Sequence, residues 1–189
     1  MKTWGEIMKK LIMMLGCGLL LNGCAVMSKN ECMTANWNLI GQQDGFNGNG
    51  SRLQQRTQAC VKHQIVLDNG SYASGYNKGL RNYCNPQTVF DYALQGNGNY
   101  QSCPMEMQNR LRPYYTVANN FYKADKQLKS LEDDIASYRV KAYDDDLKED
   151  ARKDYRKRLI EARYKLNQAE RDYANAQYEL MQFKYQMRF

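Results

Sequence analysis

The chain has 189 residues, of which 43% are hydrophobic and 25% charged, and it carries a formal charge of +7 with a single histidine. This composition is typical of a globular protein and excludes a collagen-like or wholly disordered chain. The basic excess would suit an anionic partner, so the charges have to be located before the total is interpreted.

The first 24 residues have the pattern of an export signal. Lys9 and Lys10 precede an apolar run over 11–21, which is well short of the ~20 residues needed to span a bilayer. The run ends in Leu21-Asn22-Gly23-Cys24, which resembles the lipobox of bacterial lipoproteins. The resemblance implies cleavage after residue 23 and lipidation of Cys24. The alternative is a plain secretory signal in which Cys24 is an ordinary thiol.

The residue after Cys24 bears on the destination of the protein. Position 25 is alanine, whereas aspartate there would be the usual signal for retention in the inner membrane. The resemblance to lipoproteins therefore implies an outer-membrane anchor facing the periplasm, where several acyl chains hold the protein more firmly than one. Cys17 is a weaker lipidation candidate, because cleavage there would leave an apolar stretch on the mature chain. Met8 is an alternative start to Met1.

The rest of the chain divides by composition near Pro104. All thirteen glycines precede this residue, and long heptad patterns follow it. We therefore predict an all-α fold with three segments: a signal peptide at 1–23, a disulfide-stapled helical domain at 24–104, and a coiled-coil helical hairpin at 105–189.

Two helices are predicted at the start of the stapled domain. Ser28-Lys29-Asn30-Glu31 has the sequence of a capping box, and the helix after it is predicted to run to about residue 45. A glycine-rich turn at 48–51 separates it from a second helix predicted at 52–63. Antiparallel packing of these helices would bring the start of the first beside the end of the second.

Four cysteines lie in this domain: Cys32, Cys60, Cys84 and Cys103. An even number in a small exported domain indicates two disulfides, for which the sequence allows three pairings. The antiparallel helices would place Cys32 near Cys60, and Cys84 and Cys103 bracket a short helix predicted at 86–94. We therefore favour the pairs Cys32–Cys60 and Cys84–Cys103.

Glycines recur about four residues apart in two predicted helices, at Gly41, Gly45 and Gly48 and again at Gly75 and Gly79. Each weakens a helix by up to ~1 kcal/mol relative to alanine. Close approach of a neighbouring backbone is expected to offset this loss. A glycine-mediated dimer within a membrane is the alternative, and the polar residues in the same helices argue against it.

These positions carry a resemblance to a known family. The set comprises Glu31-Cys32, Trp37, Ile40-Gly41, Asp44-Gly45, Cys60, Tyr72, Gly75, Gly79-Leu80, Tyr83-Cys84, Gly96, Tyr100 and Cys103-Pro104. Over roughly residues 28–112 the chain resembles a family of small proteobacterial lipoproteins classed as a domain of unknown function. The resemblance implies a tethered periplasmic domain without known catalytic residues. The long C-terminal segment departs from the short form of that family.

Two heptad runs follow, over 117–142 and 159–187, in which apolar residues alternate in steps of four and three. Such runs predict a coiled coil. One architecture is a single long helix that dimerises, which would make the protein a homo-oligomer through its coiled coil. The other is an antiparallel hairpin with a turn near 143–147.

The register of the two runs favours the hairpin. Reflecting the sequence about residue 145 pairs Leu131 with Leu159 and Phe121 with Ala169. Asp146-x-x-Glu149 is a capping pattern suited to the start of the second helix.

Aromatic and basic residues on the hairpin form a candidate surface for a partner protein or for the stapled domain, comprising Tyr115, Tyr122, Arg156, Arg163 and Tyr164. The export signal argues against nucleic acid, so an envelope protein, a cell-wall polymer or the membrane surface is the expected partner. The alternative interpretation is an ordinary solvated exterior of mixed charge.

No residue pattern indicates an enzyme. His63 is the only imidazole, no nucleophile motif accompanies it, and the cysteine spacings give no zinc site, so neither a metal nor a cofactor is expected. The predicted function is a non-catalytic structural or protein-interaction module of the cell envelope. The alternative is a protein that binds or hydrolyses cell-wall glycan around Asp44, near Tyr72 and Tyr76.

Overall fold

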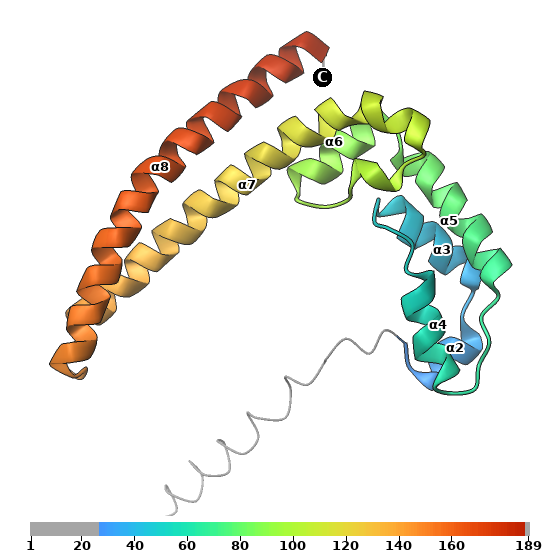
Figure 1. Cartoon of the computed structure of the whole chain (residues 1–189), viewed down its shortest axis with the longest axis horizontal. Helices are drawn as coiled ribbons and strands as arrows, with labels where there is room; N and C mark the ends of the chain where they lie inside the picture. The colour runs from blue at the N-terminus through green and yellow to red at the C-terminus, as the bar shows by residue number, and fades with distance from the viewer. Residues whose placement is uncertain (1–26, 188–189) are drawn as a thin grey trace, which may run out of the picture.

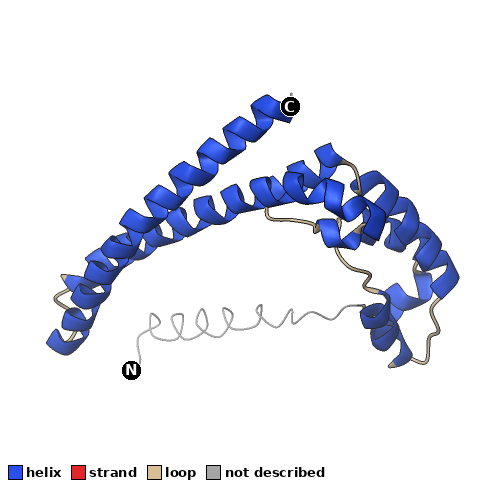
Figure 2. Cartoon of the chain, turned by 45° about the horizontal axis from the view of Figure 1, so that its top comes forward, coloured by secondary structure: helices blue, strands red, loops and turns tan. Residues whose placement is uncertain are grey.

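The computed structural model describes residues 27–187, and the predicted signal segment with Cys24 lies outside them. The helices are α2 (Lys29–Thr34), α3 (Trp37–Phe46), α4 (Leu53–Val61), α5 (Asn69–Tyr83), α6 (Pro86–Leu94), the short 3₁₀ helix η1 (Tyr100–Ser102), α7 (Met105–Ala142) and α8 (Glu149–Met187). Within the described range all regular structure is helical, which confirms the predicted all-α class (Figures 1 and 2). No helix in this range is long and apolar enough to cross a membrane.

The first predicted helix is two helices. Ser28 and Glu31 form the predicted capping box at the start of α2. The chain then leaves the helical conformation at Ala35, and the Asn36 side chain accepts a hydrogen bond from the amide of Leu39 to begin α3. The prediction of one continuous helix was wrong because Asn36 acts as an N-cap, a role for which asparagine is well suited.

Both predicted disulfides are present and buried. Cys32–Cys60 joins α2 to the end of α4, and Cys84–Cys103 joins the end of α5 to the residue after η1. The first lies in a core cluster with Trp37. In the chain-entropy model each crosslink stabilises the fold by ~3 kcal/mol, because it closes a loop in the unfolded chain between cysteines that are 28 and 19 positions apart, respectively.

Helices α3 and α5 lie side by side in the same direction, and glycine forms their contact. A Cβ atom on any of four glycines would overlap a backbone carbonyl of the facing helix: Gly41 with Tyr72, Gly45 with Tyr76, Gly75 with Asn38 and Gly79 with Gln42. The predicted close approach is therefore confirmed for these four. The main partner of α3 is α5 rather than α4. Gly48 lies beyond the end of α3, in a turn with a φ of +65°.

The long C-terminal segment is an antiparallel hairpin, as predicted. Helix α7 runs away from the stapled helices and α8 returns along it after a turn at 143–148 (Figure 1). Arg156 closes the turn, because it donates to the carbonyl oxygen of Ala142 at 3.2 Å and pairs with Glu149. Arg152 pairs with both Glu149 and Asp145 at 2.8 Å.

The register of the hairpin differs from the predicted one by about one helical turn. The ring of Phe121 packs against Tyr173, with 5.5 Å between centroids, and Tyr138 packs against Tyr155 at 6.1 Å. Phe121 was predicted to face Ala169. The shift arises because Asp146 does not cap α8: the helix begins at Glu149, so the turn is longer than the capping pattern predicted.

Packing continues across Pro104. Phe90 and Ala93 of α6 form one buried cluster with Ala118 of α7 and with Leu180 and Phe183 of α8. The rings of Phe90 and Phe183 lie 6.0 Å apart, although 93 positions separate them in the sequence. The base of the hairpin is thereby fixed to the stapled helices, and the turn lies at the far end of the molecule (Figure 1).

Candidate functional site

Asp44 is a charged side chain buried inside the stapled helices, with 5% of its surface exposed. Its two oxygens accept hydrogen bonds from Nε and Nη2 of Arg56, both at 2.8 Å. Oδ2 also accepts from the hydroxyl of Tyr72 at 2.8 Å, and that hydroxyl accepts from the amide of Arg52 at 3.0 Å. One carboxylate therefore connects α3, the start of α4 and α5.

The electrostatics of this network favour a fixed arrangement. The hydrogen bond to Asp44 raises the pKa of Arg56, so the guanidinium stays charged. Burial, and then the hydrogen bond to Asp44, raises the pKa of Tyr72, so the phenol stays protonated and donates. A two-point guanidinium–carboxylate pair is among the strongest and most directional polar contacts in proteins. This arrangement is therefore best suited to a structural role, in which it holds α3, α4 and α5 together.

Asp44 and Tyr72 were predicted as candidate site residues from the sequence, whereas Arg56 was not. A signal for it was present, because Arg56 lies four residues before Cys60 and so occupies the same face of α4 as the disulfide. The hydroxyl of Tyr76 is directed to a different acceptor from that of Tyr72. Tyr76 donates to the carbonyl oxygen of Asn49 at 2.8 Å, and its ring stacks on Tyr72.

A second buried tyrosine lies between two glycine turns. The ring of Tyr83 is fully buried, and a Cβ atom on Gly48 or Gly98, both with positive φ, would overlap it. Among the described residues no partner forms a hydrogen bond with its hydroxyl. Burial is the main cause that raises the pKa of Tyr83.

We expect stability to fall in alkali, with Tyr83 contributing. A folded pKa above the ~10 of an unfolded tyrosine means that stability is complete below pH ~10 and is lost as the pH rises from there towards the folded pKa. Tyr83→Phe should therefore flatten the decline in urea midpoint between pH 9 and 11. At pH 7 it should change the free energy of unfolding by no more than ~1 kcal/mol. Tyr143→Phe, at a position that is 70% exposed in the hairpin turn, is the control, and an equal flattening there would contradict the assignment.

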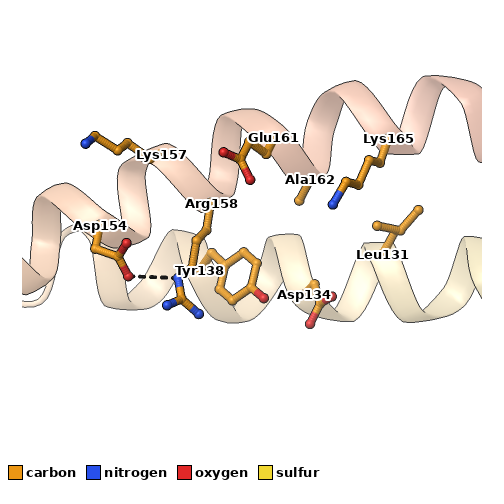
Figure 3. Close-up of a pocket in the computed structure, with 9 residues that line it drawn as sticks. All are labelled: Leu131, Asp134, Tyr138, Asp154, Lys157, Arg158, Glu161, Ala162 and Lys165. Carbon is orange, nitrogen blue, oxygen red and sulfur yellow. Dashed lines mark hydrogen bonds and ion pairs between the residues drawn. The ribbon is translucent and has the colours of Figure 1, made fainter.

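Open hollows lie along the hairpin. The hollow nearest the turn has a volume of about 410 Å³, and the next one along the hairpin has about 530 Å³; Leu131 of α7 and Lys165 of α8 line both. A third hollow of about 260 Å³ adjoins the second, and Lys123 lines both of these. We call these three together the hairpin groove. Figure 3 shows the part nearest the turn, where Arg158 reaches from α8 to lie beside Tyr138 of α7.

The charges of the hairpin groove are unevenly distributed. Lys123, Lys126 and Lys165 line its middle part, where no acidic residue contributes. Towards the turn the acidic residues Asp134, Asp154 and Glu161 line it together with Lys157 and Arg158. Asp154 is paired with Arg158 at 2.8 Å. The middle of the groove is thus a basic, partly apolar surface with Leu131 at its edge.

The five residues predicted to form a partner surface lie in three places. Tyr115 packs against Tyr100 with 5.4 Å between ring centroids, and Tyr122 lies against Gly96, so both contact the stapled helices. Arg156 is part of the turn network. Arg163 and Tyr164 are exposed on α8. The structure therefore does not bring the five together.

Within residues 27–187 there is no group of three or more His, Cys, Asp or Glu side chains that could hold a metal ion. No curated protein and no solved structure matches the chain. Residues 36–120 match a family model described as a protein of unknown function, DUF2799. This range covers α3 to α6 and the first part of α7, and so includes the glycine contact, the Asp44 network and the Cys84–Cys103 disulfide. Residues 36–120 are thus similar to DUF2799, in agreement with the family resemblance that the cysteine, glycine and tyrosine pattern predicted.

Proposed function

We propose that the protein is a non-catalytic lipoprotein of the outer membrane, anchored through acyl chains on Cys24. In this proposal the stapled helices lie near the membrane and the hairpin presents a surface to an envelope protein. The pattern of residues 1–24 supports the anchor. Several acyl chains on one cysteine would supply the membrane affinity.

The observation that carries the interaction role is the accessible, basic middle of the hairpin groove. Lys123, Lys126 and Lys165 have exposed side chains around a hollow of about 530 Å³, and the hairpin holds them in a fixed relation. Asp44, in contrast, is enclosed and already accepts three hydrogen bonds. This contrast favours a partner on the hairpin over a glycan at Asp44. An acidic segment of a periplasmic protein fits the charge of the groove.

Metabolic labelling with palmitate tests the anchor. We expect the wild-type chain and Cys17→Ser to incorporate label and to fractionate with the outer membrane. Cys24→Ser should be unlabelled and released from that fraction. Label retained in Cys24→Ser and lost in Cys17→Ser would place the anchor at the other cysteine.

Affinity capture of the full chain from envelope extracts tests the partner. The triple variant Lys123→Glu, Lys126→Glu, Lys165→Glu should lose a protein that the wild type retains, because opposite charge at the groove is removed. The control carries the same charge change at three exposed lysines outside the groove, Lys62, Lys78 and Lys153, and should retain the protein. Loss of the captured material after cell-wall digestion would identify a wall polymer instead. Equal capture by both variants would dismiss the groove.

A further inference from the structure

Helix α8 has a second heptad seam on the face opposite α7. The buried seam consists of Leu159, Ala162, Ala169, Ala176, Leu180 and Phe183. Half a turn around the helix, the positions Ile160, Tyr164, Asn167, Arg171, Ala174, Tyr178, Met181 and Tyr185 alternate in steps of four and three without a break, and all are exposed. We call this row the outer seam.

The large side chains of the outer seam are poorly covered. Tyr164 is 80% exposed and Tyr185 is 85% exposed, with Ile160, Tyr178 and Met181 each more than half exposed. Single exposed apolar residues are ordinary, but five on one helix face at coiled-coil spacing indicate a contact surface. Nothing in residues 27–187 covers this face.

We propose that the outer seam binds the outer seam of a second copy of this chain, with the two α8 helices antiparallel. The order of residues is the reason. Its two ends carry large side chains and its centre carries Asn167, Arg171 and Ala174, so reversing the helix places large side chains against large ones at both ends. Ile160 then meets Tyr185 of the second copy, and Tyr164 meets its Met181.

The centre of the outer seam selects the antiparallel direction. In a parallel pair in register, Arg171 would face the same arginine of the second copy across the seam, and two like charges there repel. In the antiparallel pair Arg171 faces Ala174 of the second copy, whose small side chain leaves room for the guanidinium. Asn167 faces Tyr178, a neighbour that can share a hydrogen bond with it.

The contact is large enough for a specific but modest dimer. Burial of three tyrosines, an isoleucine and a methionine from each copy corresponds to about 1,200 Å² in total, the lower limit for a specific interface. On one side of the outer seam, Gln168 would lie near Asn175 of the second copy. This contact causes no repulsion, because both side chains are uncharged amides. On the other flank Arg163 would lie near Lys184, both solvent-exposed. Added salt screens that repulsion, so association should strengthen with moderate salt.

Photo-crosslinking of the purified full chain tests the direction of pairing. With benzoylphenylalanine at position 160, the expected crosslink is to the C-terminal peptide around Tyr185. This link cannot form within one chain, because 25 residues of helix separate the two positions by ~37 Å. Links from position 160 to its own equivalent in the second copy would show a parallel pair and overturn the proposal.

Sedimentation tests the dimer itself. The wild type should sediment as a dimer, and Tyr164→Glu combined with Tyr178→Glu should sediment as a monomer whose helical circular-dichroism spectrum at room temperature is unchanged. Ser137→Glu, at an exposed position on α7, is the control and should remain dimeric. A wild type that is monomeric at every soluble concentration would overturn the proposal. Because the purified chain alone is used, this outcome is independent of whether an envelope protein binds the hairpin groove.

Discussion

Gly75→Ala is expected to lower the free energy of unfolding by about 3 kcal/mol. The added methyl would overlap the carbonyl oxygen of Asn38 and lie 3.0 Å from its Cα atom. Both obstacles are backbone, which cannot rotate away as a flexible side chain can. The two helices must therefore separate, and separation weakens the hydrogen bond from Asn38 to the carbonyl oxygen of Ser71. Urea unfolding followed by circular dichroism, with the disulfides intact, measures the change.

Gly70→Ala on the same helix is the matched control. A Cβ atom there would meet only a carboxylate oxygen of Asp68, at an ordinary 3.5 Å. Alanine is also the better helix former, so this variant should gain up to ~1 kcal/mol. Opposite signs at two glycines of one helix would establish that backbone contact is the reason for Gly75. A loss of equal size at both positions would contradict it.

The glycine contact and the disulfides could be predicted from the sequence because local spacing encodes them. Glycines one turn apart occupy one helix face wherever that helix is placed, so their purpose is evident before the partner is known. The Cys84–Cys103 pair likewise follows from the short helix that the two cysteines bracket, and the Cys32–Cys60 pair from the antiparallel packing predicted for the first two helices. The pattern did not reveal that α3 and α5 are parallel neighbours, because this depends on how α4 and the loops around it are folded.

The errors arose where competing signals had similar strength. From the sequence, Asn36 is compatible with a position inside a helix and with an N-cap. The extended backbone of Ala35 shows that it is an N-cap. In the hairpin, seam residues repeat every three or four positions, so a register shifted by one turn still pairs apolar with apolar. Contacts such as Phe90 with Phe183 leave no local trace, because the two residues are distant in the sequence and each is simply one apolar residue in its own helix.

Asp44→Asn is expected to destabilise the protein by about 3 to 5 kcal/mol, because it leaves the Arg56 guanidinium, only 15% exposed, without its counter-charge. The amide can accept through one oxygen only, and in either orientation its NH₂ group would face a donor of Arg56. Thermal and urea unfolding measure the loss. Asp125→Asn is the control, since the pair of Asp125 with Lys129 lies on the surface and its loss should have little effect.

A double variant separates the contact from the individual residues. If each charge stabilises the fold mainly by pairing with the other, the double variant Asp44→Ala, Arg56→Ala should lose less free energy of unfolding than the sum of the two single variants. The difference should be several kcal/mol. A residue kept for glycan chemistry behaves differently, because its substitution would leave stability intact and remove binding or turnover. Wild-type stability in Asp44→Asn would therefore return Asp44 to the functional candidates. The expected loss would instead make it the centre of the helix junction on which the orientation of α3, α4 and α5 depends.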